Sequence, residues 1–176
     1  MLFTDRSLWT MVHGIVMGGG ALLGLAAALF YLYAARNNDG APNPLPNARA
    51  LATLTSATAA ILWLAVLSGT YIVFPPYRAT PPDGLVDLAQ FPRSLIQSRP
   101  DTVWLHSFAM EAKEHVPWIA SMLATAAAFV IVRYRSMTLV DGSLRRSASI
   151  LLAICFALVS FVSLLGVFVN KVAPLQ

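Results

Sequence analysis

The sequence predicts an all-α integral membrane protein, a four-helix up-down-up-down bundle that forms a single membrane domain over residues 1–176. Only 11% of its 176 residues are charged, against roughly 25% in soluble domains. Four segments contain no Asp, Glu, Lys or Arg, and each is long enough to cross a bilayer, which takes about 20 helical residues. These segments are Ser7–Ala35, Ala50–Tyr77, His115–Val132 and Ser147–Asn170.

We place the four spans at about residues 8–35, 50–74, 104–132 and 147–170. The first charge-free segment has 29 residues, and the apolar region of a cleavable signal peptide has only about 7–15, so we interpret it as a retained helix. The third span begins before its charge-free stretch, because nearly every residue type after Thr102 favours or tolerates helix. Four spans and their connections leave no room for a soluble catalytic domain.

The connections between spans differ in length and composition. Arg36–Arg49 carries three prolines and Arg133–Arg146 carries an Asp-Gly pair, so both predict tight antiparallel hairpins. The longer connection, residues 75–103, has apolar residues at roughly helical spacing, which favours a short interfacial helix on the bilayer surface over an irregular loop. Those apolar residues are Leu85, Val86, Leu88, Phe91, Leu95 and Ile96.

The distribution of basic residues predicts the orientation, because cytoplasmic loops carry an excess of Lys and Arg. Six arginines lie in the two short turns, which therefore face the cytoplasm. Both termini and the 75–103 loop then face outward, which for a bacterial inner membrane is the periplasm. The six arginines are Arg36, Arg49, Arg133, Arg135, Arg145 and Arg146.

Two histidines on different spans are predicted to lie at nearly the same depth. His13 is 23 residues before Arg36, and His115 is 18 residues before Arg133. At 1.5 Å rise per residue these depths differ by about 7 Å. Because a histidine inside a membrane is uncommon and often functional, we expect His13 and His115 to face each other near the outer surface.

The residues around these histidines fit ligation of one haem iron by two imidazoles. Gly14 and Gly18 would let a flat cofactor approach span one. Glu111 lies one helical turn before His115 and could orient its second ring nitrogen. His106 is about 180° around the helix from His115, so it is expected in water or against a partner.

Two alternatives to haem stay open at this stage. His13 and His115 could form a cofactor-free polar cluster with Tyr71, Glu111 or lipid headgroups, or they could hold copper. Cys155 is the only cysteine and lies inside span four, which excludes an intramolecular disulfide and a CxxCH haem site. We interpret it as a small apolar residue in a helix interface.

A quinone site is a further hypothesis. A quinone ring needs an apolar slot and hydrogen bonds to its carbonyl groups. Tyr71, Trp118 and Asn170 lie at the outer ends of three spans and offer such groups.

The layout resembles that of the small four-helix membrane anchors and cytochrome b-type subunits of respiratory and photosynthetic electron-transfer complexes. The stretches that carry the likeness are Val12-His13-Gly14 and Lys113-Glu114-His115-Val116-Pro117-Trp118. The resemblance implies an electron-transfer subunit with one haem b, which passes electrons between quinone and a periplasmic partner such as a cytochrome c.

Competing functional classes are an accessory subunit without a cofactor and a small transporter. The transporter has the weakest support, because no span carries a charge at its centre and no inverted repeat is visible. No HExxH, GxSxG, phosphate-loop or Rossmann motif occurs in the sequence. The basic residues lie at the ends of the spans, where they set the orientation in the membrane, so we do not expect nucleic acid as a partner. Alanine-rich patches on three spans predict packing against other membrane subunits. They are Ala26–Ala28, Ala57–Ala60 and Ala124–Ala128.

Overall fold

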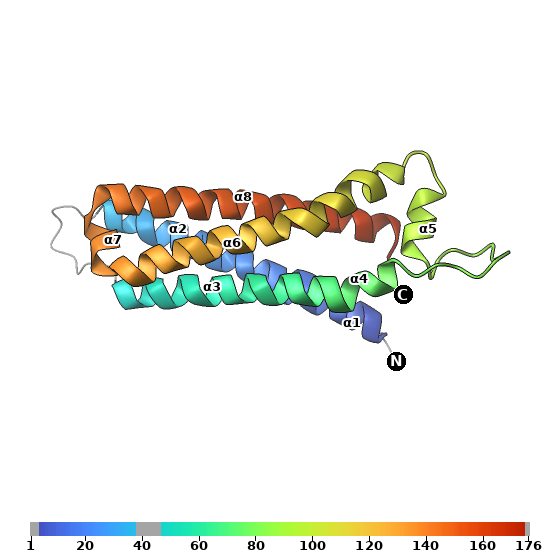
Figure 1. Ribbon diagram of the computed structural model, residues 1–176, viewed down its shortest axis with the longest axis horizontal. Helices are drawn as coiled ribbons and strands as arrows, with labels where there is room; N and C mark the ends of the chain where they lie inside the picture. The colour runs from blue at the N-terminus through green and yellow to red at the C-terminus, as the bar shows by residue number, and fades with distance from the viewer. Residues whose placement is uncertain (1–3, 38–46, 175–176) are drawn as a thin grey trace.

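Four long helices form the molecule in a computed structural model that describes residues 4–37 and 47–174. They run over Asp5–Arg36, Ala48–Tyr77, Leu105–Tyr134 and Gly142–Val172, and each is long and apolar enough to cross a membrane (Figure 1). Within the described residues every regular element is helical. The all-α bundle of four spans predicted from the sequence is therefore confirmed.

Each span except the fourth is built from more than one helical segment. Span one comprises α1 (Asp5–Met11), η1 (Val12–Gly19) and α2 (Gly20–Asn37); span two comprises α3 (Ala48–Ser68), η2 (Gly69–Val73) and α4 (Phe74–Tyr77). Span three comprises η3 (Leu105–Met110) and α6 (Glu111–Tyr134), and span four is α8 (Gly142–Val172). The segments η1, η2 and η3 are π-helical. Two short helices, α5 (Pro92–Gln97) and α7 (Ser136–Val140), lie in connections.

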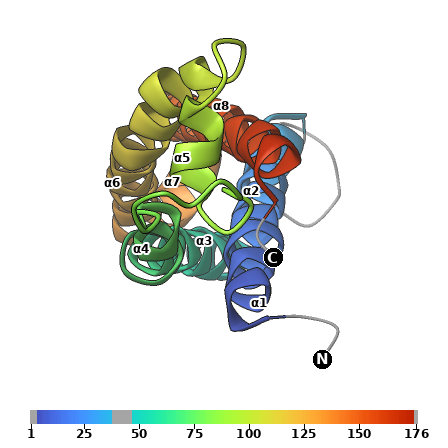
Figure 2. The same cartoon turned by 90° about the vertical axis from the view of Figure 1, so that its right-hand side faces the viewer.

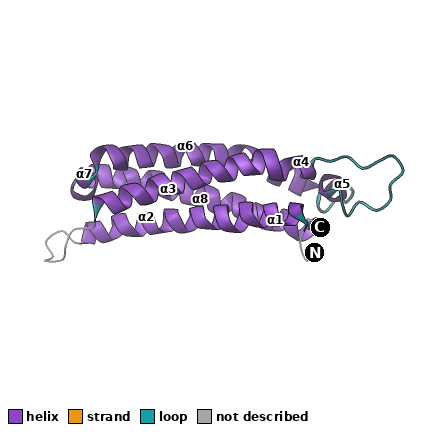
Figure 3. Cartoon of the chain, turned by 90° about the horizontal axis from the view of Figure 1, so that it is seen from below, coloured by secondary structure: helices purple, strands orange, loops and turns teal. Residues whose placement is uncertain are grey.

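The spans follow one another around a square (Figure 2). Spans one and three each pack against spans two and four, and lie diagonally opposite each other. Span directions alternate, so α5 and both chain ends lie at one end of the bundle, called the α5 end, and α7 lies at the other, called the α7 end (Figures 1 and 3). The up-down-up-down connection is as predicted.

Small and aliphatic side chains fill the core of the half that contains α7. Small residues let helix backbones approach closely, which drives association in lipid. A Cβ atom added at Gly24 would overlap the side chain of Thr58, so the close contact of α2 with α3 requires glycine there. Cys155 is fully buried in this core beside Ala120, as predicted for a small interface residue. Other fully or almost fully buried members are Ala21, Leu25, Ala28, Leu32, Ala124, Ala127, Ile131 and Leu152.

Helices α3 and α8 both start at the α7 end, and each has a side-chain cap at its N-terminus. The Asn47 carboxamide oxygen accepts a hydrogen bond from Arg49 N, and the Asp141 carboxylate accepts from Ser143 N and Leu144 N. Such caps satisfy backbone donors that have no partner within the helix. The three prolines of the first turn, at 42, 44 and 46, lie outside the described residues.

The connection between spans two and three contains a helix, but a shorter one than the apolar spacing suggested. Helix α5 has six residues, and it lies across the end of the bundle in Figure 2. Ile96 is 0% exposed and packs among Tyr77, Leu105 and Met110, whereas Val86 is 94% exposed and outside the helix. The apolar face of α5 is therefore covered by protein, and the position of this helix at the bilayer surface stays a prediction.

Large apolar side chains cover the outer surface of all four spans. In water such a surface would be costly, whereas in a bilayer it meets lipid at no cost. This surface and the four long apolar helices indicate a multi-pass membrane protein. Examples of exposed residues are Leu23, Phe30, Leu64, Ile119, Phe129 and Val167.

Candidate functional site

Three spans change from α-helix to π-helix at the α5 end. The changes occur over Val12–Gly19, Gly69–Val73 and Leu105–Met110. π-Helical turns are rare and are found frequently at functional sites, because the wider turn re-aims the side chains beyond it. His13 lies in the first of these segments and His106 in the third. The irregular helices therefore coincide with the polar end of the bundle.

His13 points toward span two. Its Nδ1 atom lies 3.2 Å from Ser68 Oγ, which also lies 3.1 Å from the carbonyl oxygen of Ala65. When Ser68 donates its one proton to Ala65, its oxygen accepts from His13 Nδ1–H, and His13 Nε2 is left as an acceptor. A Cβ atom at Gly69 would lie only 2.8 Å from His13 Cε1, so this glycine makes room for the imidazole ring.

Lys113 is a second basic side chain inside the α5 end. Its side chain is half-buried. A Cβ atom at Gly166 would lie 2.8 Å from Lys113 Nζ, so span four carries a glycine where the ammonium approaches. Lys113 is also close enough to His13 to interact with it electrostatically. Lys113 and His13, from diagonally opposite spans, are named the basic pair.

A hydrogen bond between two further polar side chains lies nearer the α5 helix. The hydroxyl of Tyr77 and Nδ1 of His106 are 3.0 Å apart, and Arg93 and Glu114 both interact electrostatically with Tyr77. His106 was expected in water or against a partner protein. The structure instead gives it a partner in this chain, because α4 turns the ring of Tyr77 inward.

His115 lies on the outside of the bundle, away from His13. Its side chain is 72% exposed and that of Glu111 is 60% exposed. His115 Nδ1 donates to the backbone carbonyl oxygen of Glu111 at 2.8 Å, while the Glu111 carboxylate is 4.0 Å away. Glu111 is therefore next to His115 as predicted, but its backbone carbonyl oxygen accepts the hydrogen bond instead of its carboxylate.

This geometry does not fit a haem held between His13 and His115. The two residues stand on diagonal spans, one ring packed on Gly69 and the other exposed. The expectation that they face each other is corrected, because matched depth sets the height of a residue but not its direction around the helix. Gly14 and Gly18 would meet no neighbouring helix if given a Cβ atom. Among the described residues no three His, Cys, Asp or Glu side chains group to hold a metal such as copper.

The three residues proposed for quinone are not gathered around one slot. Tyr71 is 72% exposed, and Asn170 is also exposed. Trp118 packs edge to face against Trp63, with ring centroids 5.8 Å apart. Each residue thus lies at the outer surface or in a separate helix contact.

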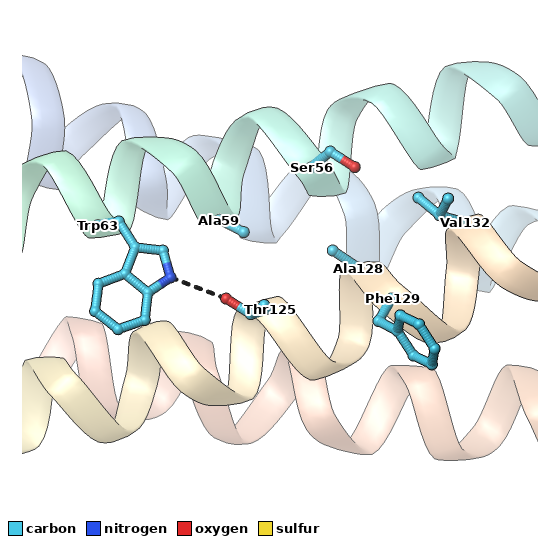
Figure 4. Close-up of a pocket in the computed structure, with 7 residues that line it drawn as sticks. All are labelled: Ser56, Ala59, Trp63, Thr125, Ala128, Phe129 and Val132. Atoms are coloured by element: carbon cyan, nitrogen blue, oxygen red, sulfur yellow. Dashed lines mark hydrogen bonds between the residues drawn. The ribbon is translucent and has the colours of Figure 1, made fainter.

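A shallow groove of about 340 Å³ runs between α3 and α6 (Figure 4). Trp63 Nε1 donates to Thr125 Oγ1 at 3.0 Å at one end of it. Small residues such as Ala59 and Ala128 form its floor, and Phe129 and Val132 line the other end. The groove is lined by no titratable side chain.

Sequence reasoning missed the central place of Lys113. It placed His106, which is seven residues earlier and on the same helix face as Lys113, in water or against a partner. In the structure Met110 is buried and His106 is half-buried, so that face of the helix points inward. Residues three apart share a helix face, so Lys113 points to the same side of the helix as the buried Met110.

Comparison with protein-family models, with curated proteins and with solved structures finds no match for this chain. The functional argument therefore rests on the polar α5 end alone.

Proposed function

We propose that this chain is a membrane subunit of a multi-subunit electron-transfer complex of the bacterial inner membrane, with both termini and the polar α5 end in the periplasm. In this proposal the subunit takes part in electron passage between quinone and a periplasmic partner such as a cytochrome c.

The observation that supports this function is the basic pair inside an otherwise apolar bundle. Ionisable side chains within a membrane are costly and commonly mark routes for protons, ions or substrates. Lys113 and His13 can donate and accept hydrogen bonds, and Tyr77 with His106 extends the polar groups toward α5. Quinone chemistry couples electrons to protons, and such groups suit it.

A haem b in this complex would be carried by another subunit or by a site that a partner completes. His115 is suited to the second case, because its Nδ1–H is bound to a carbonyl and its Nε2 is left free on an exposed face.

The alternative function is an accessory subunit without a cofactor. The observation that favours it is the exposure of small side chains on the outer faces of three spans, where partner helices could approach closely. The exposed alanines include Ala26, Ala27, Ala57, Ala60 and Ala126.

Purification from native membranes in mild detergent tests the proposal. We expect other membrane subunits to co-elute, haem bands in the reduced-minus-oxidised spectrum of the complex, and quinol-dependent reduction of a c-type cytochrome. Replacing Lys113 with Met should lower that activity while the complex stays assembled. A chain that purifies alone, or a complex whose activity is unchanged by the substitution, would remove the case for a role in electron transfer.

A further inference from the structure

A basic hollow of about 360 Å³ adjoins the groove between α3 and α6 on its α7 side. Val132 lines both cavities, so the hollow and the groove are continuous. Together they are named the α3–α6 cleft, which is basic at the α7 end and apolar farther along the spans. The hollow is lined by Arg49, Ala52, Thr53, Val132 and Arg135.

The two arginines of the hollow bring positive charge that the described residues do not balance. The guanidinium groups of Arg49 and Arg135 have neither a hydrogen bond nor an ion pair within the described part of the chain. Arg145, by contrast, donates to a backbone carbonyl oxygen of its own chain. Among the described residues of the α7 end, the one carboxylate is that of Asp141, and it caps α8. The hollow therefore suits an anion.

Arg135 also has an unusual backbone conformation. Its φ is 40° and its ψ is −113°, at the point where α6 ends and α7 begins. A positive φ is costly for a residue with a side chain, and glycine would adopt it without strain. Strained residues are found where ligands are held, and here an arginine stands in such a position at the mouth of the cleft.

The apolar part of the cleft suits a hydrocarbon chain. Its floor is formed by Ala59 and Ala128, and the exposed ring of Phe129 stands beside it (Figure 4). The hydrogen bond from Trp63 to Thr125 joins α3 to α6 and closes the end away from the arginines. The groove opens on the outer surface of the bundle, where acyl chains surround a membrane protein.

The length of the cleft matches one leaflet of a bilayer. Arg49 is 14 residues before Trp63, which is about 21 Å along a helix. A bilayer with its headgroups is about 40–45 Å thick, so one leaflet takes about half of that. The charge at the mouth then decides the occupant, because guanidinium groups bind phosphate through paired hydrogen bonds and basic pockets between spans bind anionic lipid headgroups.

We propose that the α3–α6 cleft binds one anionic phospholipid. Its phosphate lies between Arg49 and Arg135, and one acyl chain follows Ala59 and Ala128 as far as Trp63. The site is at the opposite end of the bundle from the basic pair, and it does not rest on the proposed function.

The test measures quenching of Trp63 fluorescence by lipids with brominated acyl chains, since bromine quenches a tryptophan that it contacts. The purified full-length chain is placed in phosphatidylcholine vesicles with a rising fraction of brominated phosphatidylglycerol, or of brominated phosphatidylcholine for comparison. The signal of the other tryptophans is subtracted with Trp63→Phe. We expect phosphatidylglycerol to bind about 5–30-fold more tightly, because each arginine near an anionic headgroup contributes a factor of about 5.

Substitutions of the arginines test the headgroup site. Arg49→Gln and Arg135→Gln should each lower the preference for phosphatidylglycerol about 5-fold, and the double variant should show none. Arg146→Gln is the matched control, because it removes an exposed arginine of the same end that does not line the hollow. It should leave the preference unchanged.

A second pair of substitutions tests the acyl-chain site. Ser56 is exposed and lines the groove, so Ser56→Leu fills the groove without changing the core, and it should weaken quenching by both lipids. Ala57→Leu, at the next position, is exposed but outside the groove and should have no effect. Circular dichroism establishes that each variant is folded.

Equal quenching by the two lipids in the wild type overturns the inference, as does an unchanged preference in the folded double variant. Loss of the preference in excess inorganic phosphate also overturns it, because the hollow then takes a free anion. If Ser56→Leu turns a dimeric particle into a monomeric one, a second copy of the chain occupies the groove and the lipid assignment is wrong.

Discussion

The two halves of the bundle use glycine and helix geometry differently. Toward the α7 end the spans are regular α-helices. There Gly24 lets α2 come close to α3, because it leaves room for the side chain of Thr58. Toward the α5 end three spans are π-helical, and Gly69 and Gly166 make room for His13 and Lys113. One half is arranged for association of helices in lipid. The other keeps polar side chains at a cost in stability, which is typical of a functional site.

The largest change in the free energy of unfolding is expected for a substitution in the core of the α5 end. It tests whether this core is packed like that of the α7 half. Ile96→Ala should lower the free energy of unfolding by about 2–5 kcal/mol, because the side chain is completely buried. Val86→Ala, in the same connection but exposed, should change it by less than about 0.5 kcal/mol. Denaturant unfolding in detergent micelles measures both, and equal losses would mean that α5 is not packed as described.

Two substitutions in span one compare a glycine that contacts another helix, Gly24, with one that has open space beside it, Gly20. Gly24→Ala should destabilise the protein by about 1–3 kcal/mol, because the new methyl group overlaps Thr58. Gly20→Ala meets nothing and should stabilise it by about 0.5–1 kcal/mol through helix propensity. The same unfolding assay applies. A stabilising effect at both positions would contradict the close contact of α2 with α3.

A double-mutant cycle examines the role of Gly69 as room for the imidazole ring. Gly69→Ala should cost about 1 kcal/mol, since the displaced His13 loses its hydrogen bond to Ser68. In a His13→Ala background the ring is gone, so the same change should cost nothing. The difference between the two unfolding free energies is the coupling energy. A value near zero would show that the glycine and the histidine do not meet.

An effect of similar size is expected for the hydrogen bond between Tyr77 and His106. Tyr77→Phe should lower stability by about 0.5–1.5 kcal/mol, because it removes one buried hydroxyl contact. Tyr71→Phe, on the exposed surface of the same span, serves as the control and should have no measurable effect. The NMR chemical shift of the His106 ring nitrogens offers a second measurement, which should respond to the first substitution only.

The sequence predicts the spans well because their signal is length and lack of charge. The described helices begin and end within a few residues of the predicted spans, except that the fourth begins earlier, at its Asp141 cap. The place of α5 could not be predicted in the same way. Six apolar residues at helical spacing show that a surface will be covered, but they do not say whether protein or lipid covers it.

The sequence predicted the depth of the candidate site residues in the membrane, but not the side of the helix on which each residue lies. Counting residues from the basic turns placed His13 and His115 at one depth. In helices that are apolar all round, no pattern distinguishes the inward face. The π-helical segments add to the difficulty, because they change the number of residues per turn between His106 and the rest of span three. The angular position predicted for His106 with 3.6 residues per turn was therefore wrong.

The pairing of each basic side chain with its own glycine has a consequence for biogenesis. His13 meets Gly69 within the first hairpin, and Lys113 meets Gly166 within the second. Each polar group therefore lies against the other span of its own hairpin, and this contact needs no residue of the second hairpin. The polar interior then arises when two preformed halves dock, so a defect in one half should be visible before the other has been synthesised.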